Sequence, residues 1–448
     1  MSRRRFAALT CAVALVATAA PVLPSEETPR YVLRQLALPK GLGLLSTPVR
    51  PLEPPFALAA NGAVAALAYH DARSYAASHV VVWRADGTRK VIGLPSNAVL
   101  TAVLQHYQPP FDRGYRAYRR ATFARVVLAT DGTPFATMMA GFSGAFGGTD
   151  KGVVRWTGTR WVSVNPYRDQ RDFSVPTDFD VAVAELPALR VAMTADYWGS
   201  FVNFDAVQRQ AHYQTPQAWV LDATATHVLG FGRITSLAGD YACGYIGETN
   251  GRPMPDNFNI GTQQPVALLW RNARSTRLGR GIAFGVTAHG AAVGDNRTSI
   301  DGTTQTVTRT GNSAAMEVRP GIPDGVPTLW NAGRTTALAK RAGTAFAIAR
   351  DGTIVGTFAD GAGFVVKNGT LRELDALIGR GLHGAHVAGA YALDARGRIL
   401  VTTISNGVHG IAVLDPATSL ARQREIGGGI PSSRHGLRSS AVRQQTVR

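Results

Sequence analysis

The chain has 448 residues and a hydrophobic fraction of 45%, which is enough for a sizeable core in one large or two ordinary domains. Its 47 Lys and Arg residues against 30 Asp and Glu residues give a formal net charge of +17. These basic residues are scattered through the chain, whereas a nucleic-acid-binding protein usually gathers them into an arm or patch. We therefore expect no nucleic-acid partner.

Residues 1–20 have the organisation of a secretory signal peptide. A basic start at Arg3–Arg5 is followed by an apolar Ala/Val/Leu stretch, and small residues at 17–20 suit a cleavage site. The apolar stretch is too short to span a bilayer, and no later segment is long and apolar enough. We therefore expect a secreted or periplasmic protein without an integral membrane segment. Sec is the expected export route, although Ser2–Phe6 partly matches a twin-arginine signal.

Residues 21–55 form a lead that precedes the repeated part of the chain. Tyr31–Leu38 within it has the pattern of a single strand, which we expect to close a ring of repeats against the last unit. Cleavage after the signal removes Cys11 and leaves Cys243 as the one cysteine. The mature chain is therefore expected to lack an internal disulfide and to depend on burial for its stability.

Residues 345–374 display the repeated pattern most clearly. Four short apolar runs alternate with turn sequences, of which Asp351–Gly352 and Asn368–Gly369 are typical of two-residue type I′ hairpins. The same four-strand pattern recurs across the chain, and four of the units carry a tryptophan in the third run. The seven units cover residues 56–95, 124–164, 179–229, 234–279, 283–338, 345–374 and 390–426.

A four-stranded antiparallel unit repeated seven times predicts an all-β, seven-bladed β-propeller over residues 56–426, because each sheet alone would bury only one face. A β-sandwich or a solenoid is the alternative. Residues 427–448 contain few apolar residues and have no period, so we expect a disordered basic tail. The expected assembly is a monomer.

The repeat resembles the HAF repeat of exported bacterial proteins. Ala345, Ile348 and Gly352 fit the first half of that pattern, and His79 and Trp83 fit the second half. The family's naming tripeptide is missing, and Ala349 stands where an asparagine is usual. The resemblance implies an extracytoplasmic propeller, but it implies no catalytic activity and no active site.

The long insertions are predicted to gather on one face of the propeller. They fall between the second and third strands of a unit or between units, whereas the other two connections are tight turns. Two insertions are rich in aromatic residues and arginine, which suit stacking on sugar rings and binding of hydroxyls or carboxylates. Packing of the loops is the competing explanation for the same residues. The candidate ligand-binding residues are Tyr107, Arg113, Tyr115, Arg116, Tyr118, Arg119, Trp198, His212 and Tyr213.

No catalytic or metal-binding constellation can be assembled from the sequence. His383 and His386 lie three apart but in a glycine-rich turn sequence, and Asp178–Asp180 lacks further oxygen ligands for calcium, so neither is expected to bind metal. No cofactor is expected either. The sequence therefore favours a non-enzymatic binding or scaffold propeller with an extracellular polysaccharide or protein ligand. The alternative is a polysaccharide lyase or hydrolase on the same face, for which a His, a Tyr and an Arg from separate blades would have to converge.

Overall fold

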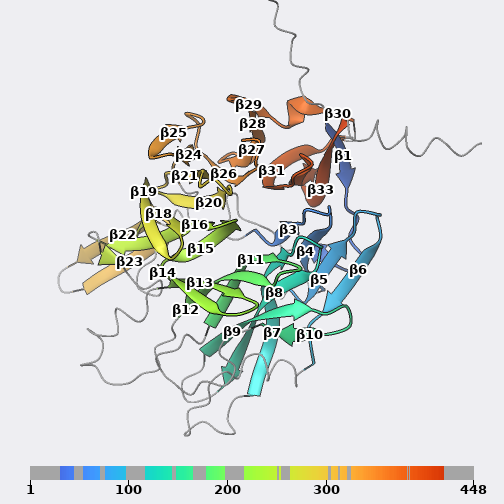
Figure 1. Ribbon diagram of the computed structural model, residues 1–448, viewed down its shortest axis with the longest axis horizontal. Coiled ribbons are helices and arrows are strands. Elements are labelled where there is room, and N and C mark those ends of the chain that lie inside the picture. The colour runs from blue at the N-terminus through green and yellow to red at the C-terminus, as the bar shows by residue number, and fades with distance from the viewer. Residues whose placement is uncertain are drawn as a thin grey trace, which may run out of the picture.

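The strands of the chain form a β-propeller (Figure 1). The computed structural model describes residues 31–44, 54–70, 76–96, 117–143, 148–164, 178–196, 216–249, 252–253, 263–300, 304–310, 313–319, 324–380, 382 and 384–417. Within these ranges every element is a strand except η3, a turn of 3₁₀-helix at Asp375–Leu377. Seven four-stranded antiparallel sheets make the blades, which confirms the predicted fold class. No helix in the described ranges is long and apolar enough to cross a membrane.

Each blade is a sheet of four strands that follow one another in chain order, except in the last blade. The blades are β3 (Phe56–Leu58), β4 (Val64–Tyr69), β5 (His79–Trp83) and β6 (Arg89–Gly93); β7 (Ala117–Leu128), β8 (Pro134–Ser143), β9 (Gly148–Trp156) and β10 (Trp161–Ser163); β11 (Asp178–Glu185), β12 (Arg190–Asp196), β13 (Gln217–Asp222) and β14 (Thr226–Phe231); β15 (Arg233–Ala238), β16 (Tyr241–Thr249), β18 (Gln264–Arg271) and β19 (Arg274–Arg280); β20 (Ile282–Val286), β21 (Ala292–Asp295), β24 (Pro327–Asn331) and β25 (Arg334–Ala337); β26 (Gly343–Ile348), β27 (Ile354–Phe358), β28 (Gly363–Lys367) and β29 (Thr370–Glu373); and β31 (His386–Leu393), β32 (Ile399–Ser405) and β33 (Val408–Pro416). We number them blade 1 to blade 7 in this order. In the chain, β17 (Arg252–Pro253) in blade 4 and the hairpin of β22 (Thr304–Thr310) and β23 (Ser313–Arg319) in blade 5 lie between the second and third strands.

Blade 7 takes its fourth strand from the start of the chain. β1 (Tyr31–Gln35) pairs antiparallel with β33 along its whole length, from Tyr31 opposite Pro416 to Gln35 opposite Ala412. Figure 1 shows β1 beside β33, at the point where the two ends of the propeller meet. Short extra strands extend three sheets: β30 (Ile378–Arg380) beside β1, β2 (Gly43–Leu44) beside β4, and β17 (Arg252–Pro253) beside β16.

Aromatic side chains pack along the first strands of four adjacent blades. Phe284, Phe346, Tyr391 and Phe56 come from blades 5, 6, 7 and 1, and neighbouring ring centroids lie 5.1–5.7 Å apart. All four side chains are buried. These rings therefore join the last three blades to the first through dispersion and edge contacts.

Buried threonine hydroxyls connect successive blades through hydrogen bonds to the main chain. The Thr137 hydroxyl in blade 2 accepts the Val181 N–H of blade 3 at 2.9 Å, and the Thr194 hydroxyl in blade 3 accepts the Ile234 N–H of blade 4 at 3.1 Å. Thr357 in blade 6 does the same for an N–H of blade 7. Each donating N–H belongs to a residue just before a β-bulge in a first strand, where the regular ladder leaves a donor without a partner in its own sheet.

The tight turns are of two kinds. Asn368 and Gly369 both have positive φ, 50° and 75°, so the predicted type I′ geometry is confirmed there. The prediction is wrong for Asp351–Gly352, where only Gly352 has positive φ (82°) and its N–H bonds back to the Ala349 carbonyl at 3.0 Å. Asp351 serves instead as an acceptor, since its Oδ1 takes the Thr353 N–H at 2.9 Å.

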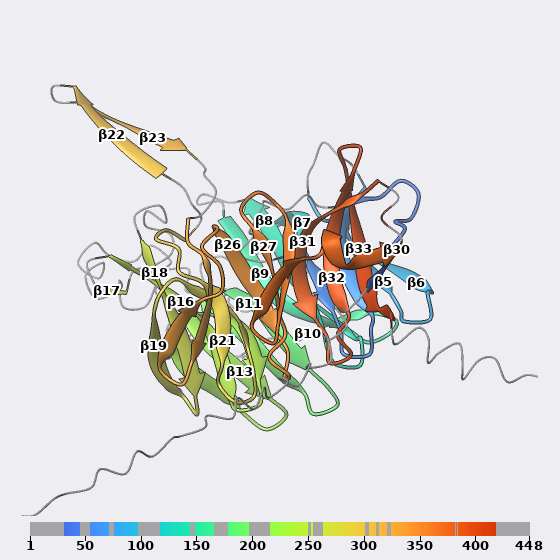
Figure 2. The same ribbon diagram turned by 90° about the horizontal axis from the view of Figure 1, so that it is seen from above.

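The turns and the long connections lie at opposite ends of the strands. Turns between the first and second strands and between the third and fourth strands all open on one face, which we call the tight-turn face. The second strands of blades 3 and 5 end on the other face, at Asp196 and Asp295, and their third strands begin there, at Gln217 and Pro327. Between the second and third strands of blade 5 lies the hairpin of β22 (Thr304–Thr310) and β23 (Ser313–Arg319), which stands away from the blades in Figure 2.

Candidate functional site: a groove between blades 1 and 2

The residues expected to bind ligand fall mostly outside the described part of the chain. Only Tyr118 and Arg119 are placed, in the backbone of β7, opposite Phe142 and Gly141 of β8. The described part of the chain therefore does not test whether the nine candidates form one site. Those outside the described ranges are Tyr107, Arg113, Tyr115, Arg116, Trp198, His212 and Tyr213.

The two sequence motifs that were considered for metal binding each keep one residue whose side chain pairs with another side chain of the protein. His386 Nδ1 lies 3.3 Å from Asp375 Oδ2, while His383 is outside the described ranges. Asp180 is buried, and its Oδ2 lies 3.0 Å from Lys151 Nζ and 3.8 Å from an Arg233 nitrogen. Burial alone would raise the pKa of Asp180, but Lys151 and Arg233 hold it below its ordinary value. Among the described residues no group of three or more His, Cys, Asp or Glu could hold a metal ion.

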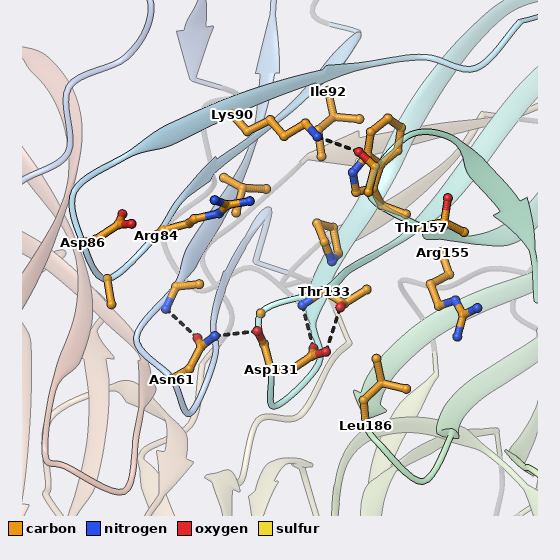
Figure 3. Close-up of a pocket in the computed structure, with 17 residues that line it drawn as sticks. Asn61, Arg84, Asp86, Lys90, Ile92, Asp131, Thr133, Arg155, Thr157 and Leu186 are labelled. Carbon is orange, nitrogen blue, oxygen red and sulfur yellow. Dashed lines mark hydrogen bonds between the residues drawn. The ribbon is translucent and has the colours of Figure 1, made fainter.

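A groove of about 860 Å³ lies on the tight-turn face between blades 1 and 2. Blade 1 contributes the β5–β6 turn, including Arg84 and Asp86, and Lys90 of β6. Blade 2 contributes the β7–β8 turn with Asp131, and the end of β9 with Arg155. Figure 3 shows Arg84 and Arg155 on opposite sides of the groove with the turn that carries Asp131 between them.

The two carboxylates of the groove are hydrogen-bonded within their own turns. Asp131 accepts the Thr133 N–H at 2.8 Å and the Thr133 hydroxyl at 3.0 Å, one on each oxygen. Asp86 Oδ1 accepts the Thr88 hydroxyl at 2.6 Å and the Thr88 N–H at 2.8 Å, and these bonds lower the pKa of Asp86. Both carboxylates therefore serve as turn caps. The nearby Arg84 charge also lowers the pKa of Asp86, but within the described residues no hydrogen bond or ion pair joins a carboxylate of the groove to one of its cations.

The three cations of the groove differ in how they are held. Lys90 Nζ donates to the Gly158 carbonyl at 2.7 Å and lies 4.9 Å from the centre of the Trp156 ring, so it is fixed by a hydrogen bond and a cation–π contact. Within the described part of the chain, the structure records no hydrogen bond or ion pair for the guanidinium of Arg84 or Arg155. Arg84 is exposed and Arg155 is half-buried, so both guanidiniums face the groove with donors that are left to solvent.

The groove is held open by contacts between its two blades. Asn61 Nδ2 donates to the Asp131 carbonyl at 2.5 Å, which joins the first turns of blades 1 and 2. At the outer edge, Trp161 Nε1 donates to the Gly93 carbonyl at 2.9 Å, and the Trp161 ring packs edge-on against Trp156. The walls are therefore fixed relative to one another before any ligand arrives.

A second groove of about 380 Å³ occupies the corresponding position between blades 3 and 4. His227 pairs with Val220 just as Lys90 pairs with Val82, and Asp222 follows Val220 by two positions as Arg84 follows Val82. His227 Nε2 lies 2.9 Å from Asp222 Oδ2, so this pair is closed on itself. A groove of this kind therefore occurs at two places in the propeller. Its charge depends on the residues that each blade carries at the lining positions.

A sequence feature of the first groove was missed because the ligand-binding residues were sought in the long insertions. Both third-to-fourth-strand turns, RADGTRK at 84–90 and RWTGTR at 155–160, carry a basic residue at each end. Such turns share one face of a propeller, and those of adjacent blades are neighbours. What the sequence could not show is that Asp86 and Asp131 are occupied as turn caps while the arginines are not.

Comparison with known proteins shows similarity only to solved structures. No family model matches the chain and no curated protein matches it, so the resemblance to HAF repeats stays a prediction. The β-propeller domain of the Trilobed protease from Pyrococcus furiosus is 9% identical, with 85% of this chain and 95% of that chain covered and a TM-score of 0.43. The Hadza microbial sialidase Hz136 is 12% identical, covering 82% and 65%, with a TM-score of 0.36. A B. megaterium levansucrase mutant is 8% identical, covering 70% and 85%, with a TM-score of 0.31. Nothing about ligand or activity follows from likenesses of this degree.

Proposed function

We propose that this protein is an exported binding propeller and that it takes an anionic ligand in the groove between blades 1 and 2. Export is supported by the signal-like residues 1–20. The ligand is a carboxylate, sulfate or phosphate group, which pairs with a guanidinium through two parallel hydrogen bonds. The binding face is the tight-turn face rather than the face of the long connections.

The state of the charges in the groove carries this proposal. An arginine side chain offers five N–H donors. No hydrogen bond or ion pair of the Arg84 or Arg155 guanidinium is recorded within the described residues, and Asp86 acts on Arg84 only through its charge. The oxygens of Asp86 and Asp131 accept hydrogen bonds from their own turns rather than from the arginines, although the charge of Asp86 still acts on Arg84. An incoming anion therefore meets the guanidiniums without having to displace a protein carboxylate.

The chemistry of the groove supports binding rather than catalysis. Its lining residues include no histidine and no tyrosine. The lowered pKa of Asp86 makes that carboxylate a weaker base than an ordinary aspartate. Elsewhere in the described ranges, the side-chain partners recorded for histidines are Ser78, His70, Asp222 and Asp375, and none is a tyrosine or an arginine.

Titration calorimetry with anions of different classes tests the proposal. Polygalacturonate, poly-L-glutamate and pyrophosphate are titrated into the wild type and into the variants Arg84→Ala and Arg155→Ala. Loss of one charge-assisted pairing should cost about 1.5–3 kcal/mol, or roughly 10- to 150-fold in Kd, for any anion that binds there. Higher salt should weaken wild-type binding more than variant binding.

Arg334→Ala is the matched control. Arg334 is exposed on the fourth strand of blade 5, next to the same kind of turn, but does not line the groove. Its removal should leave every titration unchanged. The proposal fails if no anion of the panel binds, or if binding is as tight in both groove variants as in Arg334→Ala.

A further inference from the structure

The floor of the blade 1–2 groove is apolar although its walls are charged. Ala63, Val82, Ile92 and Pro134 line it and are buried in the core, and the half-buried ring of Trp156 adds aromatic surface. A small hydrated anion would leave this floor uncovered. The groove therefore suits a ligand that has an apolar face as well as an anionic group.

The walls offer acceptors as well as donors. Asp86 Oδ2 takes no recorded hydrogen bond within the described residues, and it stands on the same turn as the unused guanidinium of Arg84. Lys90 has used one of its three donors on the Gly158 carbonyl. A ligand that satisfies both Asp86 and Arg84 must bring hydroxyl donors together with its anionic group. Inorganic phosphate and sulfate can pair with Arg84 but do not bring the set of hydroxyl donors that a sugar offers to Asp86.

The dimensions indicate a chain rather than one ring. The volume of about 860 Å³ lies near the upper end of the usual range for ligand pockets, roughly 300–1,000 Å³. The lining runs from the Arg84 turn of blade 1 across blade 2 to Leu186 of blade 3. Most lining residues belong to turns, whereas an extended peptide gains its affinity mainly from main-chain bonds to an open strand edge.

We propose that the groove binds a segment of an acidic sugar chain of the uronate class, an inference that rests on the proposed function. Pyranose rings lie over the apolar floor, their carboxylates pair with Arg84 and Arg155, and their hydroxyls donate to Asp86. The chain crosses from blade 1 to blade 2 in the direction that joins the two guanidiniums in Figure 3.

Calorimetry with short, defined ligands tests the sugar class separately from the charge. The probes are galacturonate, guluronate and glucuronate tetramers, the methyl ester of the galacturonate tetramer, tetra-L-glutamate and pyrophosphate. At least one uronate tetramer should bind at least about tenfold more tightly than tetraglutamate. The galacturonate tetramer should also bind more tightly than its methyl ester. Both results are expected because only the sugar acids supply ring faces, hydroxyls and carboxylates together.

Asp86→Asn separates the classes within one site. Asparagine keeps the oxygen that caps Thr88 but removes the negative charge and turns Oδ2 from an acceptor into an amide donor. Pyrophosphate should therefore bind several-fold more tightly, whereas the uronate tetramer loses the acceptor for its hydroxyl and should gain less than pyrophosphate. Asp222→Asn, in the corresponding groove between blades 3 and 4, should change neither the pyrophosphate titration nor the uronate titration.

Two results overturn the inference in different ways. If tetraglutamate or pyrophosphate binds as tightly as every uronate tetramer and depends equally on Arg84 and Arg155, the sugar class is wrong while the anion-binding groove stands. If no probe depends on the two arginines, the inference and the proposed function fall together.

Discussion

Removing the Asp295 carboxylate should destabilise the propeller by leaving a buried guanidinium without its counter-ion. Asp295 and Arg297 have no exposed surface. Asp295 Oδ1 accepts Arg297 Nε and Oδ2 accepts Arg297 Nη2, both at 2.7 Å, and the Thr344 hydroxyl of blade 6 donates to the same Oδ2. In Asp295→Ala the guanidinium keeps no counter-ion among the described residues. Its recorded contacts are the Ile300 carbonyl at 2.8 Å, Thr344 at 3.3 Å and the Phe284 ring at 5.4 Å.

The expected cost follows from the burial of the pair. Breaking a buried ion pair by removing one partner costs about 3–5 kcal/mol, a large share of the roughly 5–15 kcal/mol that stabilises an ordinary domain. With an unfolding entropy of about 2.1 cal/mol/K per residue over the roughly 390 residues from 31 to 417, this corresponds to a fall in Tm of about 4–6 °C.

Differential scanning calorimetry of two further variants tests the physical cause. Asp295→Ala/Arg297→Met removes the stranded charge along with its partner, so it should recover at least half of the lost Tm. Arg341→Ala removes ion pairs with Asp360 and Glu373, in which the side chains are 40–55% exposed, and a cation–π contact with Phe358, and should cost clearly less than Asp295→Ala. The reasoning is refuted if Asp295→Ala melts with the wild type or if the double variant is no more stable than the single one.

The remaining predictions concern one inter-blade hydrogen bond, one thiol and one carboxylate. Thr194→Val should lower the free energy of unfolding by about 1–3 kcal/mol in chemical denaturation, because it strands the buried Ile234 N–H; an unchanged midpoint would contradict this. Burial raises the pKa of Cys243 to about 12, so a disulfide reagent at pH 8 should label it only with the rate of unfolding, and rapid labelling of the native protein would disprove the burial. Hydrogen bonds from the Thr224 main chain and hydroxyl lower the pKa of Asp222, so its stabilising effect is present at neutral pH and is lost as the pH falls below about 4. The difference in Tm between the wild type and Asp222→Asn should therefore shrink from pH 6 to pH 2.5, and a constant difference would be the opposing result.

The repeat pattern determined the architecture because turn chemistry and strand length are local. Asn368–Gly369 has the φ values that its dipeptide predicts, since both residues tolerate positive φ. Asp351–Gly352 has the same kind of dipeptide but a longer loop. There the Ala349 and Thr353 main chains bond to each other, and the aspartate uses its side chain instead of a positive φ.

The groove could not be predicted from the same reasoning because it depends on contacts between repeats. Arg84 and Arg155 belong to different blades and share no local motif beyond a basic residue before a turn. An acidic neighbour such as Asp86 can pair with an arginine or cap its own turn. Side-chain geometry decides between the two, and the sequence does not contain it. The buried pairing of Asp295 with Arg297 has the opposite outcome at a similar spacing.

A crystal structure of the protein grown with a galacturonate tetramer tests the central claim most directly. The account predicts the sugar on the tight-turn face between blades 1 and 2, with carboxylates within hydrogen-bonding distance of the Arg84 and Arg155 guanidiniums and a hydroxyl on Asp86. A tetramer bound among the long connections on the opposite face, with the groove left to solvent, would contradict it.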